Sequence, residues 1–152
     1  MQQFKDGINF LMPISGLIVY NQMKRSKKVM PKVEIINYGR YAQWDRDSKK
    51  LPEFVELTTF IKSEIDVEFG MIVEIVQGKG RFLEYIIDHP PFRDDSGEIS
   101  PPFTGSYQIR SNPYRFFLGD TVWAPIEDKK GNWNLIIKID GKEVAKKTII
   151  LF

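Results

Sequence analysis

The sequence contains no cysteine, and only one of its 152 residues is a histidine. Without cysteine the chain forms no disulfide, no thiolate nucleophile and no zinc site with sulfur ligands. The single histidine, His89, excludes sites built on a histidine pair, and no Walker loop or G-x-G-x-x-G motif is present. We therefore expect no metal site and no cofactor, and the sequence assigns no catalytic residue.

No apolar run is long enough to cross a bilayer. The run at residues 8–20 has 13 residues, whereas a spanning helix needs about 20, and Pro13 and Gly16 interrupt it. No small-x-small cleavage site follows, as a signal peptide would require. The absence of both signals, together with the lack of cysteine, predicts a cytoplasmic protein.

Three interpretations of residues 1–30 stay open. We favour an N-terminal extension peripheral to the domain that follows. A basic stretch comes directly after the apolar run, so residues 8–28 could instead make a weak contact with a membrane surface. Alternatively, the natural chain starts at Met30, because a strand pattern begins immediately after it.

Net charge is only +2, but it is unevenly distributed. Residues 1–50 carry +6, and residues 51–152 carry −4. A basic head on a mildly acidic body places any contact with a polyanion near the N-terminus. We expect no nucleic-acid partner for the body.

From residue 31 onward the apolar residues recur with a period of two. In the segment 64–76, Phe69, Met71 and Val73 lie at every second position on one face, and charged residues such as Glu68 and Glu74 fall on the other, which is typical of a half-buried antiparallel strand. Trp133 begins a second alternating segment, and Asp140-Gly141 then predicts a tight hairpin turn. Shorter strands are expected at 33–38, 54–60, 81–88, 106–110, 114–118, 121–124 and 142–152.

Seven to nine short strands and no helical period predict an all-β domain over residues 31–152. The expected architecture is a two-sheet antiparallel β-sandwich, immunoglobulin-like, with a short N-terminal extension. Two loops interrupt the strands: a charged one at 43–52, and one at 89–103 that holds four of the nine prolines. Prolines restrict the backbone, so the second loop should be stiff.

Aromatic residues gather around an arginine in the stretch NYGRYAQW at 37–44. Such rings beside Arg40 could stack on sugars or bases. For Tyr41 a place in the core is the favoured alternative, because tyrosine packs in sandwich interiors with its hydroxyl reaching out. For Trp44 the two interpretations balance, because a charged loop follows at once. Arg40, Tyr41 and Trp44 are therefore candidate ligand-binding residues.

His89 lies at the start of the proline-rich loop, beside Asp88 and close to Asp94 and Asp95. This grouping permits acid–base chemistry or a hard cation, although DDSGE lacks the alternating oxygen ligands of a calcium loop. A histidine that simply caps a strand end is the more common case. His89 is retained as a candidate ligand-binding residue.

The stretch RFFLGDTVWAPI at 115–126 places Gly119-Asp120 between two apolar runs. We interpret it as a turn, in which glycine supplies an unusual backbone conformation and the aspartate accepts a bond from a following amide. Asp120 is also a candidate ligand-binding residue. In a rival interpretation, Asp120 joins Asp88, His89 and Asp94 in the cleft of a hydrolase-like enzyme.

Several blocks of the sequence together resemble a bacterial family described only as a domain of unknown function. They are VEIINYGRYAQWDRDSKKLPEFVELTT, IDVEFGMIV, FFLGDTVWAPI and GNWNLIIKIDGKEVAKKTI. The resemblance covers about residues 31–152 and implies a small, single-domain bacterial protein. It assigns no activity, ligand or site residue. The expected function is a non-enzymatic module that binds a protein surface or a glycan, and the sequence does not specify an oligomeric state.

Overall fold

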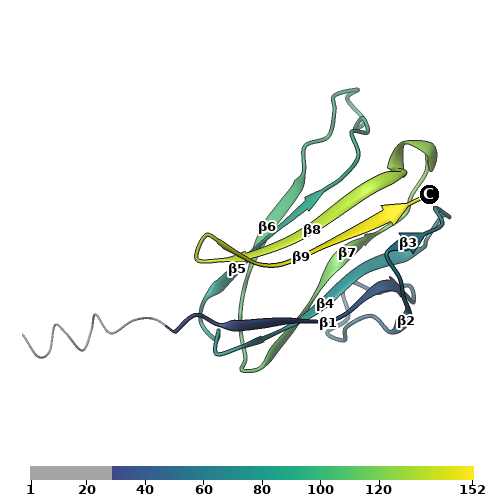
Figure 1. Cartoon of the computed structure of the whole chain (residues 1–152). Coiled ribbons are helices and arrows are strands. Elements are labelled where there is room, and N and C mark those ends of the chain that lie inside the picture. Colours follow the sequence, from purple (N-terminus) through teal and green to yellow (C-terminus); the bar gives the residue numbers. More distant parts are fainter. Residues whose placement is uncertain (1–28) are drawn as a thin grey trace, which may run out of the picture. The chain divides into compact units, whose positions relative to one another are not determined.

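The computed structural model describes residues 29–152, which form two β-sheets packed face to face (Figure 1). Sheet I has the strand order β2-β1-β4-β7, and sheet II has the order β3-β9-β8-β5-β6. The strands of sheet I are β1 (Lys32–Tyr41), β2 (Phe54–Leu57), β4 (Glu68–Val76) and β7 (Tyr114–Thr121). Those of sheet II are β3 (Phe60–Ile61), β5 (Phe82–Asp88), β6 (Phe103–Gln108), β8 (Gly131–Ile139) and β9 (Lys142–Leu151). A single-turn 3-10 helix covers Glu127–Lys129.

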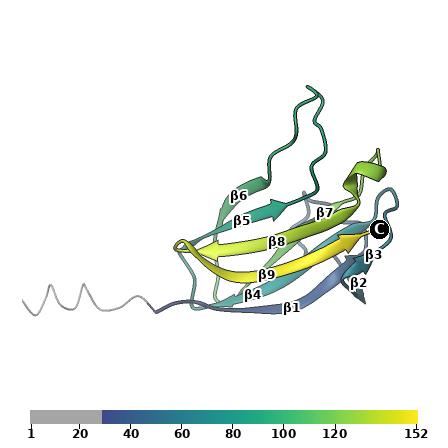
Figure 2. The same ribbon diagram turned by 45° about the horizontal axis from the view of Figure 1, so that its top comes forward.

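Neighbouring strands are antiparallel except for β3, which pairs with β9 in parallel. The predicted two-sheet antiparallel sandwich is therefore confirmed. The long polar and proline-rich segment between β5 and β6 projects beyond the sheets (Figure 2).

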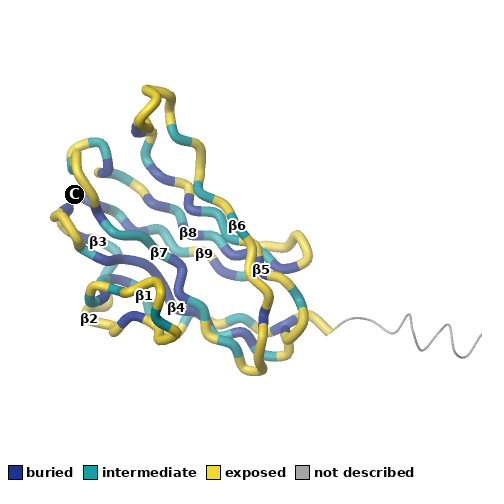
Figure 3. The backbone as a smooth tube through the Cα atoms, turned by 180° about the vertical axis from the view of Figure 1, so that it is seen from behind, coloured by how far each residue is buried: buried dark blue, intermediate teal, exposed yellow. Residues whose placement is uncertain are grey.

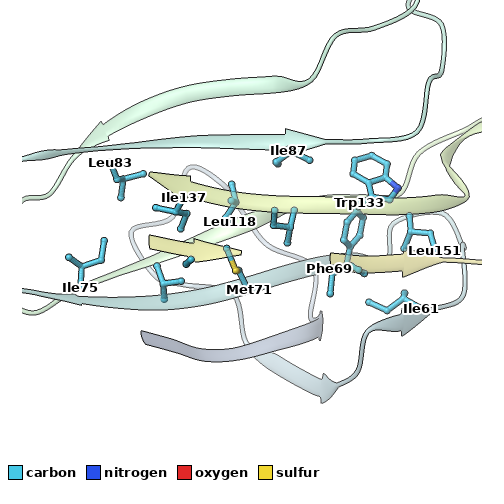
Figure 4. Close-up of a cluster of buried hydrophobic side chains, with 14 of the residues drawn as sticks. Ile61, Phe69, Met71, Ile75, Leu83, Ile87, Leu118, Trp133, Ile137 and Leu151 are labelled. Carbon is cyan, nitrogen blue, oxygen red and sulfur yellow. The ribbon is translucent and has the colours of Figure 1, made fainter. Parts of the chain in front are cut away.

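The core lies between the sheets, where the alternating apolar residues of both layers meet (Figure 4). Phe69 and Met71 of β4 are fully buried, as are Trp133 and Ile137 of β8. Each of these residues occupies an inward position of the predicted period-two pattern. The hairpin between β8 and β9 is also confirmed, because Asp140 and Gly141 both have positive φ angles, of 53° and 77°.

Sheet I is buried on both faces along much of β4 (Figure 3). On its outer face a second apolar cluster consists of Tyr41, Ile72 and Phe117, with Trp44 packed against it. Trp44 belongs to the loop at 42–53, so this loop folds back over the outer face.

Gly119 and Asp120 do not form a turn, contrary to the sequence interpretation. They lie inside β7, where Gly119 pairs with Gly70 of β4. A Cβ atom on Gly119 would overlap the Phe69 carbonyl oxygen and lie 2.6 Å from the Phe117 ring. The glycine is thus required by close packing of two strands. No strand forms at 121–124, because β7 ends at Thr121.

The predicted strand at 54–60 is also wrong as a single element. It divides into β2 and β3, which belong to different sheets. No helix among residues 29–152 is long and apolar enough to cross a membrane. The three interpretations of the N-terminal extension concern residues 1–30, of which residues 1–28 lie outside the described part of the chain.

Candidate functional site

A groove of about 550 Å³ runs along β7, the edge strand of sheet I. We call it the β7 groove. One wall is formed by β5 and β6 of sheet II, and the other by the loop at 42–53. The residues that line it are Trp44, Arg46, Ser48, Lys49, Leu51, Tyr85, Ile87, Phe103, Tyr107 and residues 114–120 of β7.

The floor of the groove is the open edge of β7, since among residues 29–152 no strand other than β4 pairs with it. Val122, just past the strand end, donates its N–H to Val67 O at 2.9 Å, in register with the β4–β7 ladder. In an antiparallel ladder the bonded pairs alternate with unbonded ones. Val122 is bonded in this ladder, and every second residue before it in β7 is bonded to β4 in the same way. The backbone N–H and C=O groups of the residues in between, Arg115, Phe117 and Gly119, therefore point away from β4 and into the groove.

Three aromatic rings form the inner wall. The rings of Tyr85 and Tyr107 stack with centroids 6.0 Å apart, and Phe116 lies 5.3 Å from Tyr107. Gly105 makes room for Tyr85, because a Cβ atom there would lie 2.6 Å from the tyrosine hydroxyl. Burial raises the pKa of Tyr85, and its neighbours Tyr107 and Asp120 add to the rise. The wall presents flat apolar rings with hydroxyl groups.

The outer wall is fastened by an ion pair with a buried carboxylate. Arg46 donates from Nη2 to Glu68 Oε2 at 2.6 Å and from Nη1 to Oε1 at 3.3 Å. The Thr121 hydroxyl donates to the same Oε1 at 2.8 Å. The Glu68 side chain is 1% exposed, whereas that of Arg46 is 46% exposed. Arg46 also lies over the Trp44 ring, so the loop, β4 and β7 are held together.

We expect Arg46→Ala to lower the free energy of unfolding by roughly 2 kcal/mol, because it leaves a buried carboxylate without its charged donor. Arg40→Ala is the matched control. It removes an ion pair with Glu56 at 3.3 Å, in which both side chains are largely exposed, and should cost less than about 1 kcal/mol. Urea melts of both variants provide the comparison. Equal losses would show that the Arg46 pair does not fasten the wall.

Asp120 lies at one end of the groove floor. Its Oδ1 accepts the N–H of Thr121 at 2.8 Å, which is a backbone group of the free edge. Burial raises the pKa of Asp120, although the Thr121 amide and the charge of Arg46 act in the opposite direction. The side chain therefore closes the end of the open edge.

The raised pKa of Asp120 makes its effect on stability depend on pH. A carboxylate whose pKa is higher in the folded state destabilises that state once it ionises, and the penalty disappears when both states are protonated. Asp120→Asn keeps an oxygen that can accept the Thr121 amide. We expect this variant to be at least as stable as the unmodified chain near neutral pH, with the difference shrinking below about pH 4. Urea melts across this range measure it; a loss at neutral pH that persists in acid would contradict the assignment.

The other candidate residues lie outside the β7 groove. Arg40 pairs with Glu56 of β2, on the far side of sheet I. Tyr41 is buried in the outer cluster, its hydroxyl donating to Asn37 Oδ1 at 2.6 Å. Both nitrogens of His89 lie 2.8 Å from carbonyl oxygens, of Pro90 and Pro101, and its ring stacks on Phe92. Of the five candidates, the groove brings together Trp44 and Asp120.

The four residues of the rival hydrolase do not share one cleft either. Asp94 is at the tip of the β5–β6 segment, where its Oδ1 accepts bonds from Ser96 and Glu98. Asp88 faces Asn134 on the outer side of sheet II, at 3.4 Å. Only Asp120 lines the groove. Within residues 29–152 no three His, Asp or Glu side chains are placed to hold a metal ion.

The sequence did not reveal the aromatic wall of the groove or the basic residues Arg46 and Lys49 of its outer wall. Tyr85, Tyr107 and Phe116 occupy alternate positions in three strands, a pattern that reads as core. The signal available in the sequence was the residue type, because tyrosine often keeps its polar tip at the surface. In the structure Tyr107 is 52% exposed and its ring stacks on that of Tyr85. Arg46 carried no signal of its own, because its partner Glu68 lies 22 positions away in a different element.

Comparison with known proteins places the chain in a family. A family model described as "Domain of unknown function (DUF3859)" matches residues 28–150. The chain belongs to the DUF3859 family. This confirms the resemblance stated above, and the family description names no activity. A search of curated proteins finds no match.

Solved structures support the fold of this DUF3859 domain. An immunoglobulin-like protein from Pseudomonas aeruginosa matches with a TM-score of 0.66 and 17% identity, covering 84% of this chain and 100% of that one. The sandwich is therefore immunoglobulin-like, as predicted. An alkylpurine DNA glycosylase from Pseudomonas fluorescens, bound to DNA with an abasic-site analogue, matches with a TM-score of 0.38 and 10% identity. That match covers 79% of this chain and 30% of the glycosylase, and carries no argument.

Proposed function

We propose that this domain is a non-enzymatic binding module and that its ligand occupies the β7 groove. The observation that carries the proposal is the composition of the groove. A wall of aromatic rings, of which Tyr107 is exposed and Tyr85 and Phe116 are half-buried, faces a polar loop across a strand edge that no other described strand pairs with. Aromatic residues with a few well-placed polar groups are typical of surfaces that bind ligands and protein partners.

A protein segment is the first candidate ligand and a glycan the second. The glycan is supported by the stacked rings of Tyr85 and Tyr107, since such flat faces can pack on sugars. A hydrolase-like enzyme is the alternative from another functional class. It has less support, because Asp120 is the single member of the proposed acid–base group that lines the groove.

The experiment uses the full chain, screened against a library of random linear peptides and against a glycan array. Tyr107→Ala removes an exposed ring from the groove wall. Phe82→Ala is the matched control, because Phe82 is also an exposed ring of sheet II but lies on β5 facing away from the groove. We expect a ligand whose binding is weakened by Tyr107→Ala and kept by Phe82→Ala. A ligand insensitive to both changes, or turnover of a substrate, would contradict the proposal.

A further inference from the structure

We propose that the ligand of the β7 groove is an extended polypeptide segment, which binds as an additional strand on the free edge of β7. This inference rests on the proposed function and specifies its partner. Strand addition requires a row of unpaired backbone donors and acceptors that a single chain can reach. The groove provides that row along its floor.

The open stretch of β7 has a defined length and a defined end. Backbone groups of Arg115, Phe117 and Gly119 point away from β4, and no described residue donates to or accepts from them in the groove. The next group in the series, the Thr121 N–H, is already bonded to Asp120. At about 3.4 Å per residue, the open edge is roughly 17 Å long.

An open strand edge is normally protected against unwanted pairing by charges, prolines or bulges. Residues 116–119 of β7, with the sequence FFLG, contain none of these. The protection comes instead from the two walls. Because the loop at 42–53 and strands β5 and β6 rise on either side, the groove admits a single extended chain more readily than the edge of another sheet.

The two walls differ in chemistry, and this specifies the partner further. Alternate side chains of an added strand face opposite ways. Those on the inner side would meet the rings of Tyr85, Tyr107 and Phe116, which favour apolar groups. Those on the outer side would meet the loop at 42–53, where Arg46 is already paired with Glu68 but Lys49 makes no ion pair with any described residue and can meet an acidic side chain. The expected partner is a segment in which apolar and acidic residues alternate.

The test uses a peptide selected on the full chain from a library of random linear peptides. Arg115→Pro removes a backbone N–H that faces the groove, while the hydrogen bonds of β7 to β4 are kept, because proline is tolerated on the open side of an edge strand. Arg115→Ala is the matched control. It removes the same side chain and its 3.1 Å ion pair with Glu74, but keeps the N–H.

We expect Arg115→Pro to weaken binding roughly tenfold or more relative to Arg115→Ala, as loss of a backbone hydrogen bond at the interface would do. A second measurement does not depend on the folding of the proline variant. N-methylation of the peptide at each position in turn should abolish binding at alternate positions only, because every second amide of an added strand faces β7.

The outcomes separate this inference from the proposed function. Equal affinity of the two Arg115 variants, together with no alternation in the N-methyl series, overturns strand addition. If Tyr107→Ala still weakens that peptide, the binding function stands. Binding of a glycan alone, sensitive to Tyr107→Ala, also overturns the inference and supports the function. A chain that binds neither class overturns both.

Discussion

Gly119→Ala is expected to destabilise the domain by at least about 3 kcal/mol, at the upper end of what overpacking costs. The added Cβ atom would overlap the Phe69 carbonyl oxygen and press on the Phe117 ring. The position opposite is Gly70, where a Cβ atom would in turn lie 2.7 Å from Gly119 Cα. The atoms in the way are mostly backbone of the β4–β7 pair, so side-chain rotation cannot relieve the contact.

Arg115→Ala is the control for this change, because it places alanine on the same strand at an exposed position. It removes one exposed ion pair and should cost less than about 1 kcal/mol. Denaturant melts of both variants, with a near-ultraviolet circular dichroism spectrum for each, give the comparison. A Gly119→Ala variant as stable as Arg115→Ala would show that β4 and β7 are not in this register.

The second large effect is expected for Trp133→Ala, which should lower the free energy of unfolding by about 3–5 kcal/mol. Trp133 is fully buried in β8. Its ring contacts Phe69 of sheet I at 5.1 Å and His89 at 5.6 Å, so it joins both sheets and the base of the β5–β6 segment. The indole Nε1 also donates to Lys129 O at 2.8 Å, and truncation leaves that carbonyl without its donor.

Trp123→Ala is the matched control, since Trp123 is 37% exposed and lies in the same aromatic group. It should cost less than half as much as Trp133→Ala, because less surface is returned to water. Thermal and urea unfolding measure both. A larger loss of stability for Trp123→Ala than for Trp133→Ala would contradict this account, because it would mean that the loop after β7 stabilises the sandwich more than the core tryptophan does.

The fold class could be predicted because one physical signal dominates it. The alternation around Phe69 and Trp133 assigns inward and outward positions without any knowledge of partner strands. The hairpin at Asp140 is equally local, since two residues carry its backbone conformation. The alternation and the hairpin both depend on residues that are close in the sequence, so they can be recognised without knowing which strands pair.

The β7 groove could not be predicted in the same way, because it depends on which strand edges lie together. Gly119 reads as a turn residue when only its neighbours in sequence are considered. Its true constraint is Gly70, which the pairing of two distant strands brings opposite to it. Likewise, Glu68 reads as a solvated residue of an alternating strand, yet it is buried by Arg46 from the loop that covers the outer face.

The candidates Trp44 and Asp120 were identified for reasons that differ from their places in the structure. Trp44 packs against Phe117 at 5.0 Å and lines the groove with one edge, so it combines the two interpretations that the sequence left open. Asp120 bonds to the following amide, as expected, but at the end of an open strand edge instead of in a turn. The hydrogen bond of Asp120 was predicted correctly, whereas its place in the fold was not.

Residue-resolved amide hydrogen exchange of β7, with and without a peptide selected on the full chain, tests the central claim most directly. In the free protein we expect Arg115, Phe117 and Gly119 to exchange quickly and their neighbours Phe116 and Leu118 slowly, because only the latter bond to β4. With the peptide bound, the first three should become slow as well. If those three amides are already protected in the free chain, or stay unprotected at saturation, the open edge of β7 is not the binding site.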